Sequence, residues 1–281
     1  MPKVNRSHFL LGAHGLAVLR GWTRGEEAVG ARVDELLRLV KELDAHPLNA
    51  ESEIDELDVS SGYALWSDTY DQPNNPLISL EEPVVLGLLQ GLPRGTALDA
   101  ACGTGRYALY LRELGFNVVA VDRSAAMLSK ARSKVPSARF ALADISALPV
   151  TSGSVDVAVC ALALDHCPNL TASVIELSRV LKPDGHLVVS ELHPANAIIG
   201  GGAFFTAGDG RRGIVKKYWH GVADYVTAFV KAGFEIEACV ERVQTEREVL
   251  MMRTAKIAPR VCIDAFVGVP LVLAWRLRRA R

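Results

Sequence analysis

The sequence predicts an α/β fold: a doubly wound, mostly parallel seven-stranded sheet with an antiparallel edge strand, plus an N-terminal helical arm. Two observations support this prediction. Between residues 77 and 191, helical and strand-like segments alternate, which is typical of parallel sheets whose strands are joined by right-handed crossovers. After residue 222, two strand-like segments follow one helix without a full crossover between them, which indicates an antiparallel pair at one edge.

Local patterns give the expected elements in order. Helices are expected at 80–89, 106–114, 125–134, 171–181 and 222–232, and strands at 96–100, 117–122, 139–143, 154–162, 186–191, 234–243 and 267–276. The strand at 154–162 reads SVDVAVCAL, a continuous apolar run that is typical of a strand covered on both faces. A further helical insertion is expected between the last two strands.

The first fifty residues differ from the rest and predict a helical arm. Thr23 and Glu26 have the spacing of a capping box, and His46-Pro47 would end the helix. Between them, apolar residues recur at spacings of four and three: Val29, Val33, Leu36, Val40 and Leu43. This seam is too short for a free coiled coil, so it packs on the same chain or on a second subunit. We expect residues 1–50 to form the arm, a candidate homo-oligomerisation element, and residues 51–281 to form the main domain.

Composition and charge argue against several classes of partner. The chain has 31 Lys and Arg against 32 Asp and Glu, a net charge of −1, without the basic excess that nucleic-acid binding usually needs. The longest apolar run, 266–275, holds ten residues including a proline, whereas a membrane span needs about 20. The five cysteines form no CxxC pair and no signal-peptide pattern opens the chain, so we expect a cytoplasmic protein with reduced thiols.

The segment LDAACGTG, residues 98–105, is the most informative part of the sequence. Its glycines allow a tight turn after a strand and a close approach of the backbone to a ligand before a helix begins. Asp122 ends the next strand 17 residues beyond Gly105, where a carboxylate can accept both hydroxyls of a ribose. Asp144 ends the third strand, 22 residues later. Asp99, in LDAACGTG, ends the strand before the loop. Three strand-terminal carboxylates therefore outline one edge of a nucleoside site.

At these residues the sequence resembles the class I S-adenosylmethionine-dependent methyltransferases, in particular the small-molecule group with ubiquinone/menaquinone-type and natural-product enzymes. The resemblance covers about residues 63–276 and rests on LDAACGTG, VVAVDRS followed by Met127, FALADISALP, SVDVAVCALALDH and RVLKPDGHLVVSELHP. It implies S-adenosylmethionine as cofactor, a small-molecule methyl acceptor and a role in natural-product tailoring. It implies cofactor contacts from Tyr63, Trp66, Tyr70, Asp99, Ala101, Gly103, Gly105, Asp122, Arg123, Met127, Asp144, Ile145 and Ala161.

The resemblance also implies a role for each part of this set. Asp99 would orient the loop and the ammonium end of the cofactor, and the loop glycines would lie under its methionine portion. Asp122 would hold the ribose, and Asp144 with the Ile145 backbone would read the adenine amine. The adenine would be flanked by Arg123 and Met127.

Two features of this set concern the shape of the cofactor site. Ala101 stands where the family's loop usually has its first glycine, which bears on the detail of the loop. Tyr63, Trp66 and Tyr70 precede the domain, either as an aromatic helix packed on the core or as a lid whose rings attract the sulfonium cation.

Methyl transfer is an in-line displacement, so alignment and exclusion of water come first and a base is optional. The candidate bases are His166 after the fourth strand, His193 after the fifth and His220 before the next helix. His166 also matches a family position whose role is frequently structural. We expect no metal site, since an ordinary turn explains the ligand types beside His166.

The acceptor pocket is expected after the fifth strand. Its apolar and aromatic candidates are Phe204, Phe205, Tyr218 and Trp219. Arg212 belongs to a basic cluster there, which either is a solvated loop or holds an anionic acceptor. The acceptor atom, oxygen, nitrogen or carbon, cannot be read from these residues.

Two other functions are compatible with parts of the sequence. A nicotinamide-dependent reductase could use the same loop and ribose-binding acid. However, the chain lacks a YxxxK catalytic pair. The second acid for the adenine, Asp144, and the antiparallel strands expected at the end of the chain also argue against a reductase. A non-catalytic protein could bind the cofactor and assemble through its arm.

Overall fold

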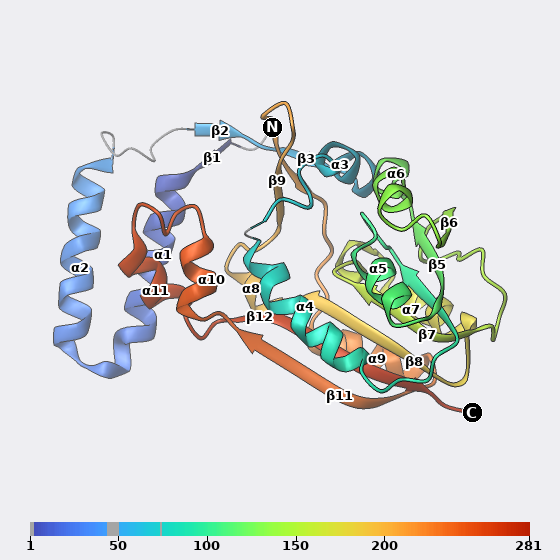
Figure 1. Cartoon of the computed structure of the whole chain (residues 1–281). Coiled ribbons are helices and arrows are strands. Elements are labelled where there is room, and N and C mark those ends of the chain that lie inside the picture. Colours follow the sequence, from blue (N-terminus) through green and yellow to red (C-terminus); the bar gives the residue numbers. More distant parts are fainter. Residues whose placement is uncertain (1–2, 44–50, 74) are drawn as a thin grey trace.

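The computed structural model describes residues 3–43, 51–73 and 75–281. Its largest element is a seven-stranded sheet with the strand order β11-β12-β8-β7-β4-β5-β6 (Figure 1). In chain order, these strands are β4 (Thr96–Ala100), β5 (Asn117–Asp122), β6 (Arg139–Leu142), β7 (Val155–Ala161), β8 (Leu181–Leu192), β11 (Phe234–Val243) and β12 (Pro270–Arg279).

The sheet is parallel except for one strand. β4 pairs in parallel with β5 and β7, β5 with β6, and β7 with β8. β12 is antiparallel to both of its neighbours, β8 and β11. The predicted doubly wound, mostly parallel sheet with antiparallel pairing at one edge is therefore confirmed. The antiparallel strand lies one place inside the edge, because β12 enters between β8 and β11.

Helices cover both faces of this sheet (Figure 1). One face carries α4 (Pro76–Leu89), α5 (Arg106–Glu113) and α6 (Ala125–Lys134), and the other carries α7 (Leu170–Val180) and α9 (Val222–Lys231). Residues of β8 alternate between the two cores: Val188 packs on the α4 side, and Leu187 and Val189 pack on the α7 side. This period of two sends apolar side chains to both faces, as expected for buried strands.

The N-terminal arm contains two helices joined by a 3₁₀ turn. The helices are α1 (Arg6–Gly21) and α2 (Glu26–Lys41), and the turn is η1 (Trp22–Arg24). Thr23 lies inside the turn, and the N-cap of α2 is Gly25, with φ of 106°. The predicted capping box at Thr23 is therefore wrong, since the helix begins after a left-handed glycine. The predicted stop at His46-Pro47 lies outside the described residues.

The arm packs on a late part of the same chain. That part consists of α10 (Glu246–Met251) and α11 (Pro259–Phe266). Phe9 of α1 stacks on Phe266 with ring centroids 5.7 Å apart, and Leu39 of α2 is buried in the same apolar cluster. Val40, which belongs to the predicted seam, is 53% exposed. The buried face of the arm is thus covered by its own chain, which leaves part of the seam in solvent.

A smaller sheet stands beside the carboxyl ends of the main strands. It has the order β3-β10-β9, and α3 packs against it through Trp66, Phe205 and Val215. The elements are β3 (Asp55–Leu57), α3 (Val59–Trp66), β9 (Ala203–Thr206) and β10 (Arg212–Val215). The remaining short elements are β1 (Lys3–Asn5), β2 (Glu51–Glu53), η3 (Leu164–His166) and α8 (Pro194–Ile198). Among the described residues, the helices are all too short or too polar to cross a membrane.

One buried carboxylate ties three of these elements together. Glu81 of α4 has no solvent exposure. It accepts hydrogen bonds from Arg106 Nη1 at 2.8 Å, Tyr107 Oη at 2.7 Å and Ser190 Oγ at 2.6 Å. Arg106 and Tyr107 begin α5 and Ser190 lies on β8, so Glu81 fixes the start of the helix that follows the glycine loop.

We expect Glu81→Ala to lower the free energy of unfolding by about 3 kcal/mol, because it leaves Arg106 and two hydroxyls without their buried acceptor. Urea denaturation measures this loss. Glu82→Ala, a change at the neighbouring and partly exposed position, is the matched control and should cost under about 1 kcal/mol. Equal losses in the two variants would contradict the role of Glu81.

Candidate functional site

The loop between β4 and α5 adopts a left-handed backbone at three positions. Ala101 has φ of 60°, Gly103 of 53° and Gly105 of 85°. Ala101 therefore occupies a conformation that favours glycine, at a cost of about 1–2 kcal/mol. A Cβ on Gly103 would meet no atom within 4 Å, whereas one on Gly105 would lie 3.0 Å from Ala131 Cβ. Gly103 thus faces open space, and Gly105 lets α5 approach α6.

Asp122, at the end of β5, holds this loop in place. Its Oδ2 accepts from the backbone N–H of Gly103 at 2.8 Å, and its Oδ1 accepts from that of Ser124 at 2.8 Å. Burial raises the pKa of Asp122 above its usual range, although these N–H groups oppose the shift. The carboxylate keeps free lone pairs for a ligand.

Asp144 lies farther out, after β6. Its Oδ1 accepts from the Ser146 N–H at 2.9 Å and from Ser146 Oγ at 2.7 Å, and its Oδ2 is 3.3 Å from Arg123 Nη1. Partial burial opposes the effect of these partners, and on balance the pKa of Asp144 is lowered. Asp144 is therefore an ionised acceptor at the outer end of the site.

The structure brings most of the expected cofactor residues around one cavity. The expected residues that line it are Tyr63, Tyr70, Ala101, Gly103, Asp122, Arg123, Met127, Asp144, Ile145 and Ala161. Sequence reasoning missed further lining residues: Val59, Ala143, Leu162, Ala163 and Cys167. These are small or apolar residues beside the expected ones, and no motif distinguishes them.

Three expected cofactor residues do not line this cavity. Gly105 acts through helix packing, as described above. Trp66 stacks on Tyr63, with ring centroids 5.7 Å apart, and on Phe205, at 5.4 Å. Asp99 is 1% exposed, and its Oδ2 has no hydrogen-bond partner within the described ranges. Burial raises the pKa of Asp99 to about 7.

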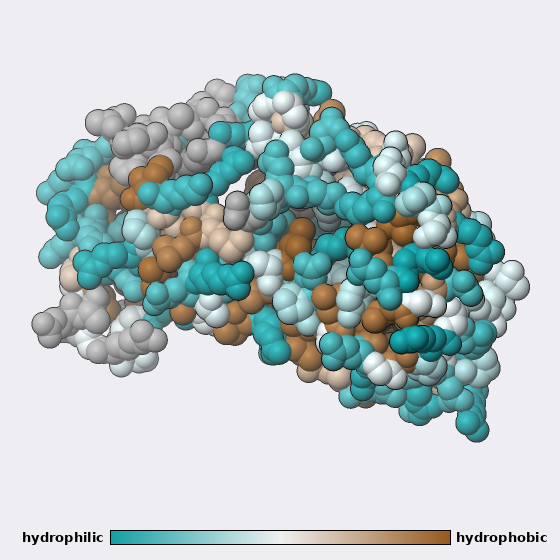
Figure 2. Space-filling model, viewed as in Figure 1, coloured by the Kyte–Doolittle hydropathy of each residue, from teal (hydrophilic) through white to brown (hydrophobic). Residues whose placement is uncertain are grey.

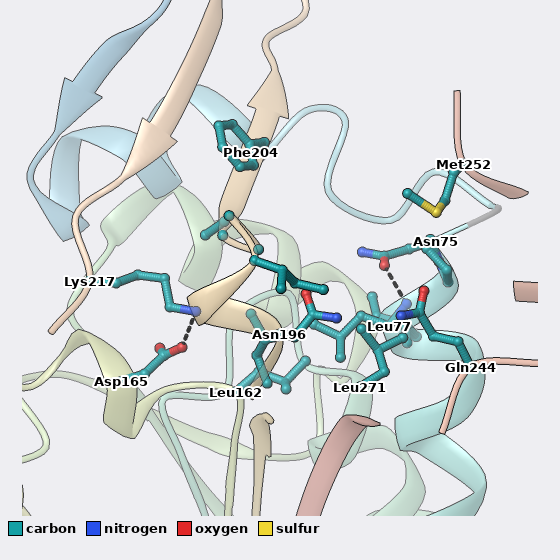
Figure 3. Close-up of a pocket in the computed structure, with 18 of the residues that line it drawn as sticks. Asn75, Leu77, Leu162, Asp165, Asn196, Phe204, Lys217, Gln244, Met252 and Leu271 are labelled. Atoms are coloured by element: carbon teal, nitrogen blue, oxygen red, sulfur yellow. Dashed lines mark hydrogen bonds and ion pairs between the residues drawn. The ribbon is translucent and has the colours of Figure 1, made fainter. Parts of the chain in front are cut away.

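A second cavity of about 360 Å³ adjoins the first. The two share Tyr63, Tyr70, Leu162 and His166 in their walls. Figure 3 shows the second cavity, with Leu162 and Leu271 at its centre and Phe204 and Met252 at its margin. Phe9 from the arm also lines it. Its wall is mostly apolar, so this cavity suits a small apolar molecule.

The polar groups in the second cavity are few. Asp165 and Lys217 form an ion pair, with Oδ2 and Nζ 2.5 Å apart. Asn75, Asn196 and Gln244 also line the wall. In the sequence, Asp165 is noticeable only as a metal-ligand type of residue, and Lys217 only as part of a basic cluster. Sequence patterns are local, whereas these two residues meet only in the folded structure.

Of the three candidate bases, the structure places only His166 at the junction of the two cavities. Its Nδ1 lies 2.7 Å from the carbonyl oxygen of Lys216, and its Nε2 lies 2.9 Å from Tyr63 Oη. Because a carbonyl only accepts, Nδ1 carries a proton and donates it to Lys216, and Nε2 forms the hydrogen bond with the Tyr63 hydroxyl. Both ring nitrogens are engaged, so His166 fixes the position of Tyr63.

His193 and His220 lie away from the junction. His193 caps α8, because its Nδ1 accepts from the Ala195 N–H at 3.1 Å, and its Nε2 lies 2.9 Å from Glu241 Oε1. His220 Nε2 lies 2.8 Å from the carbonyl oxygen of Cys167. Neither ring lines either cavity, so the expectation that one of them is the base finds no geometric support.

The expected acceptor residues are dispersed. Phe204 lines the second cavity, and Phe205 lies behind it, stacked on Trp66. Tyr218 and Trp219 line a smaller hollow with His220, which shares Asp165 and Lys217 with the second cavity. Arg212 lies on β10 in register with Thr206, outside the walls of both cavities. Sequence order alone could not show on which side of the small sheet each residue would lie.

Within 3–43, 51–73 and 75–281, no group of three or more His, Cys, Asp and Glu residues is arranged to hold a metal ion. The geometry instead matches a nucleoside-type ligand beside an apolar molecule.

Comparison with known proteins agrees with this geometry. Residues 98–189 match the family model described as a methyltransferase domain. The malonyl-acyl-carrier protein O-methyltransferase of Salmonella typhimurium is 32% identical over 141 residues, which are 50% of this chain and 56% of that protein. The chain therefore spans about half the length of the curated relatives it matches.

Two solved structures show the same fold. An S-adenosylmethionine-dependent methyltransferase from Mesorhizobium loti has a TM-score of 0.55 and 23% identity, over 71% of this chain and 97% of that one. The (4+2)-cyclase SpnF has a TM-score of 0.58 and 17% identity, over 82% and 99%. Residues 98–189 therefore match a methyltransferase domain, and the chain has the fold of a solved S-adenosylmethionine-dependent methyltransferase, in agreement with the family that its sequence resembles.

Proposed function

We propose that this chain transfers the methyl group of S-adenosylmethionine to a small, largely apolar and uncharged molecule. One observation supports this most directly: the cavity at the strand ends opens, past Tyr63 and His166, onto an apolar cavity of about 360 Å³. A donor in the first cavity and an acceptor in the second would meet at these shared residues. The expected role in natural-product tailoring stays a prediction.

The residues of the first cavity fit the cofactor. Asp99 does not line the cavity, but the Oδ2 of its buried carboxylate has no partner among the described residues, and in this proposal it pairs with the ammonium group. Open space beside Gly103 suits a chain that runs close to the backbone, and Asp122 suits the ribose hydroxyls. Met127 and Ile145, both buried, would contact the adenine.

In this proposal, the protein contributes mainly alignment and exclusion of water. The bound cofactor supplies an electrophilic methyl group on a sulfonium. The stacked rings of Tyr63, Trp66 and Phe205 close the junction, and Tyr63 is held by its hydrogen bond to His166. Aromatic rings near a sulfonium stabilise the cation without attacking it.

The charge of the acceptor cavity favours a neutral acceptor. Lys217 is the cation in its described wall, and Asp165 already neutralises it at 2.5 Å. Arg212, for which an anionic acceptor was one of two alternatives, lies outside this wall. An anionic group would therefore enter a mostly apolar cavity without a counter-charge, which is unfavourable.

Calorimetry with S-adenosylhomocysteine tests the cofactor site. We expect binding to the wild-type chain and about 10- to 100-fold weaker binding to Asp122→Asn, which loses a charged acceptor for the ribose. Asp34→Asn, the same change on exposed α2, is the control and should bind as the wild type does. A nicotinamide cofactor should cause no thermal shift. Binding of that cofactor instead of S-adenosylhomocysteine would favour the reductase.

Activity is tested by transfer of a tritiated methyl group from S-adenosylmethionine. We expect label in neutral apolar phenols, alcohols or amines and less label in charged analogues, since the acceptor cavity lacks a free counter-charge. A protein that binds S-adenosylhomocysteine but labels no member of a broad panel would favour the non-catalytic alternative.

The binding should depend on pH through Asp99. Because burial raises the pKa of Asp99 to about 7, the carboxyl is protonated below that pH and must lose its proton to pair with an ammonium. Affinity for S-adenosylhomocysteine should therefore fall as the pH drops below about 7, by up to about tenfold per unit. Asp99→Asn should bind more weakly at pH 8 and lose most of this slope. Identical slopes in calorimetry of the two proteins would count against the pairing.

We also propose that the arm forms a contact between copies of the chain. Leu37 and Val40 of α2, three positions apart on one helix face, are each 53% exposed. Figure 2 shows brown hydrophobic residues on the arm among teal hydrophilic ones. Leu37→Glu should lower the mass measured by light scattering if this face associates, whereas Asp34→Asn should not. A wild-type protein of monomer mass would remove this proposal.

A further inference from the structure

Two buried polar atoms in the acceptor cavity have no hydrogen-bond partner in the part of the chain that the structure describes. They are Asp165 Oδ1 and Gln244 Nε2. Both residues line the cavity, and they are 9% and 4% exposed. A buried polar atom without a partner costs about 1–3 kcal/mol, so two of them in one wall indicate a ligand that supplies the missing partners.

The two atoms come from different parts of the cavity wall. In Figure 3, Asp165 and Lys217 lie at one side and Gln244 lies at the other, with Leu162, Asn196 and Leu271 between them. Asp165 follows β7, beside the junction with the cofactor cavity. Gln244 follows β11 and lines the cavity on the opposite side. The cavity thus has Asp165 at one side and Gln244 at the other, with two leucine side chains and Asn196 between them.

The contacts of Asp165 leave one carboxylate oxygen available. Lys217 Nζ lies 2.5 Å from Oδ2. The loop is fixed from behind by Glu191, whose Oε1 accepts from the Leu164 N–H at 2.8 Å. His166 Nε2 lies 3.6 Å from Oδ1, which is too long for a hydrogen bond, and this nitrogen is already bonded to Tyr63 Oη at 2.9 Å. Oδ1 is therefore an acceptor of hydrogen bonds beside the point where the methyl group would arrive.

Gln244 offers the opposite chemistry. The amide Nε2 carries two N–H donors and no acceptor. Its backbone is fixed by hydrogen bonds with Val269 and Gly268, at 2.9 and 2.8 Å, so the side chain is anchored to the turn before β12. A carbonyl or ether oxygen of a bound molecule would satisfy it.

Resting on the proposed function, we propose that the acceptor is an uncharged apolar molecule with two polar ends: a reacting O–H or N–H that faces Asp165, and a hydrogen-bond-accepting oxygen that faces Gln244. Asp165 is then a catalytic residue, Lys217 a positioning residue, and Gln244 a specificity determinant. The lone pair of the acceptor oxygen or nitrogen forms the new bond to the methyl carbon. The S–C bond breaks with its electron pair going to sulfur, and the acceptor proton goes to Asp165 Oδ1.

The test uses the full chain saturated with S-adenosylhomocysteine, titrated with matched neutral probes in a calorimeter. The bifunctional probes are butyl esters of 4-hydroxybenzoate and of 3-(4-hydroxyphenyl)propanoate, which differ in the spacing of their ends. The corresponding 4-methoxy ethers lack the O–H, and 4-hexylphenol lacks the carbonyl. We expect at least one bifunctional probe to bind at least about tenfold more tightly than its ether and than the alkylphenol.

Variants assign each preference to its residue. Asp165→Asn should lose the preference for O–H over the ether, and Gln244→Leu should lose the preference for the ester over the alkylphenol. Gln244→Glu, of the same shape but without N–H donors, should bind the ester more weakly than the wild type. Asp34→Asn and Gln90→Leu make the same changes on exposed surface and should keep both preferences. Asp165→Asn/Lys217→Met, which leaves no unpaired lysine, repeats the first comparison if Asp165→Asn unfolds.

Turnover tests the proton transfer itself. Transfer of tritiated methyl to the phenol oxygen of the tighter probe should fall at least about 100-fold in Asp165→Asn, with affinity for S-adenosylhomocysteine within about threefold of the wild type. Transfer at the wild-type rate in this variant, or equal binding of all probes by the wild type, overturns the inference alone. No uptake of S-adenosylhomocysteine by folded protein overturns the proposed function, and the inference with it.

Discussion

The cofactor side of the molecule depends on the hydrogen bonds that the Asp122 carboxylate accepts. This carboxylate joins the N–H of Gly103, in the loop after β4, to the N–H of Ser124, which caps α6, at 2.8 Å each. Two adjacent strands and the helices that follow them are therefore held in one arrangement by a single buried group. Such a carboxylate is stable in the interior only because charge-assisted backbone hydrogen bonds replace its hydration. The same group lines the cavity, so Asp122 joins the loop and the cavity wall through one carboxylate.

On the acceptor side, Glu191 holds a loop in place in the same way. It has no solvent exposure, and its oxygens accept from the backbone N–H groups of Leu164 and Asp165 at 2.8 and 3.4 Å. Burial raises the pKa of Glu191 well above its usual range, since the N–H donors only partly compensate for lost water. The turn η3 is thereby fixed to β8, and η3 carries Asp165 and His166 to the boundary of the two cavities. One buried acid for each loop thus aligns the two halves of the site.

The sheet and the cofactor residues were largely predictable from sequence because their signals are local. Apolar runs such as 154–162 and acids at strand ends reflect constraints within one βα unit, and Asp122 and Asp144 lie where those constraints predict. The acceptor side was not predictable in this way. Tyr218 and Trp219 follow the expected strand in sequence but line another hollow, while Gln244 reaches the cavity from a distant turn. His193 is a candidate base from its place after a strand, but its ring caps α8. Side-chain direction in irregular segments depends on tertiary contacts that no local pattern encodes.

The division between the two cavities also explains why related proteins inform the donor more than the acceptor. The matched methyltransferase domain, residues 98–189, contains β4 to β7 and most of β8, with nearly all of the cofactor wall. Most of the acceptor wall lies outside it: Phe9, Asn75, Asn196, Phe204, Lys217, Gln244, Met252 and Phe266. Phe9 comes from the arm and stacks on Phe266, so an appendage to the domain closes the acceptor cavity. A chain can therefore keep the donor chemistry while its arm and late helices change the acceptor. In the proposed function, Phe9 therefore makes the arm part of the wall that contacts the acceptor.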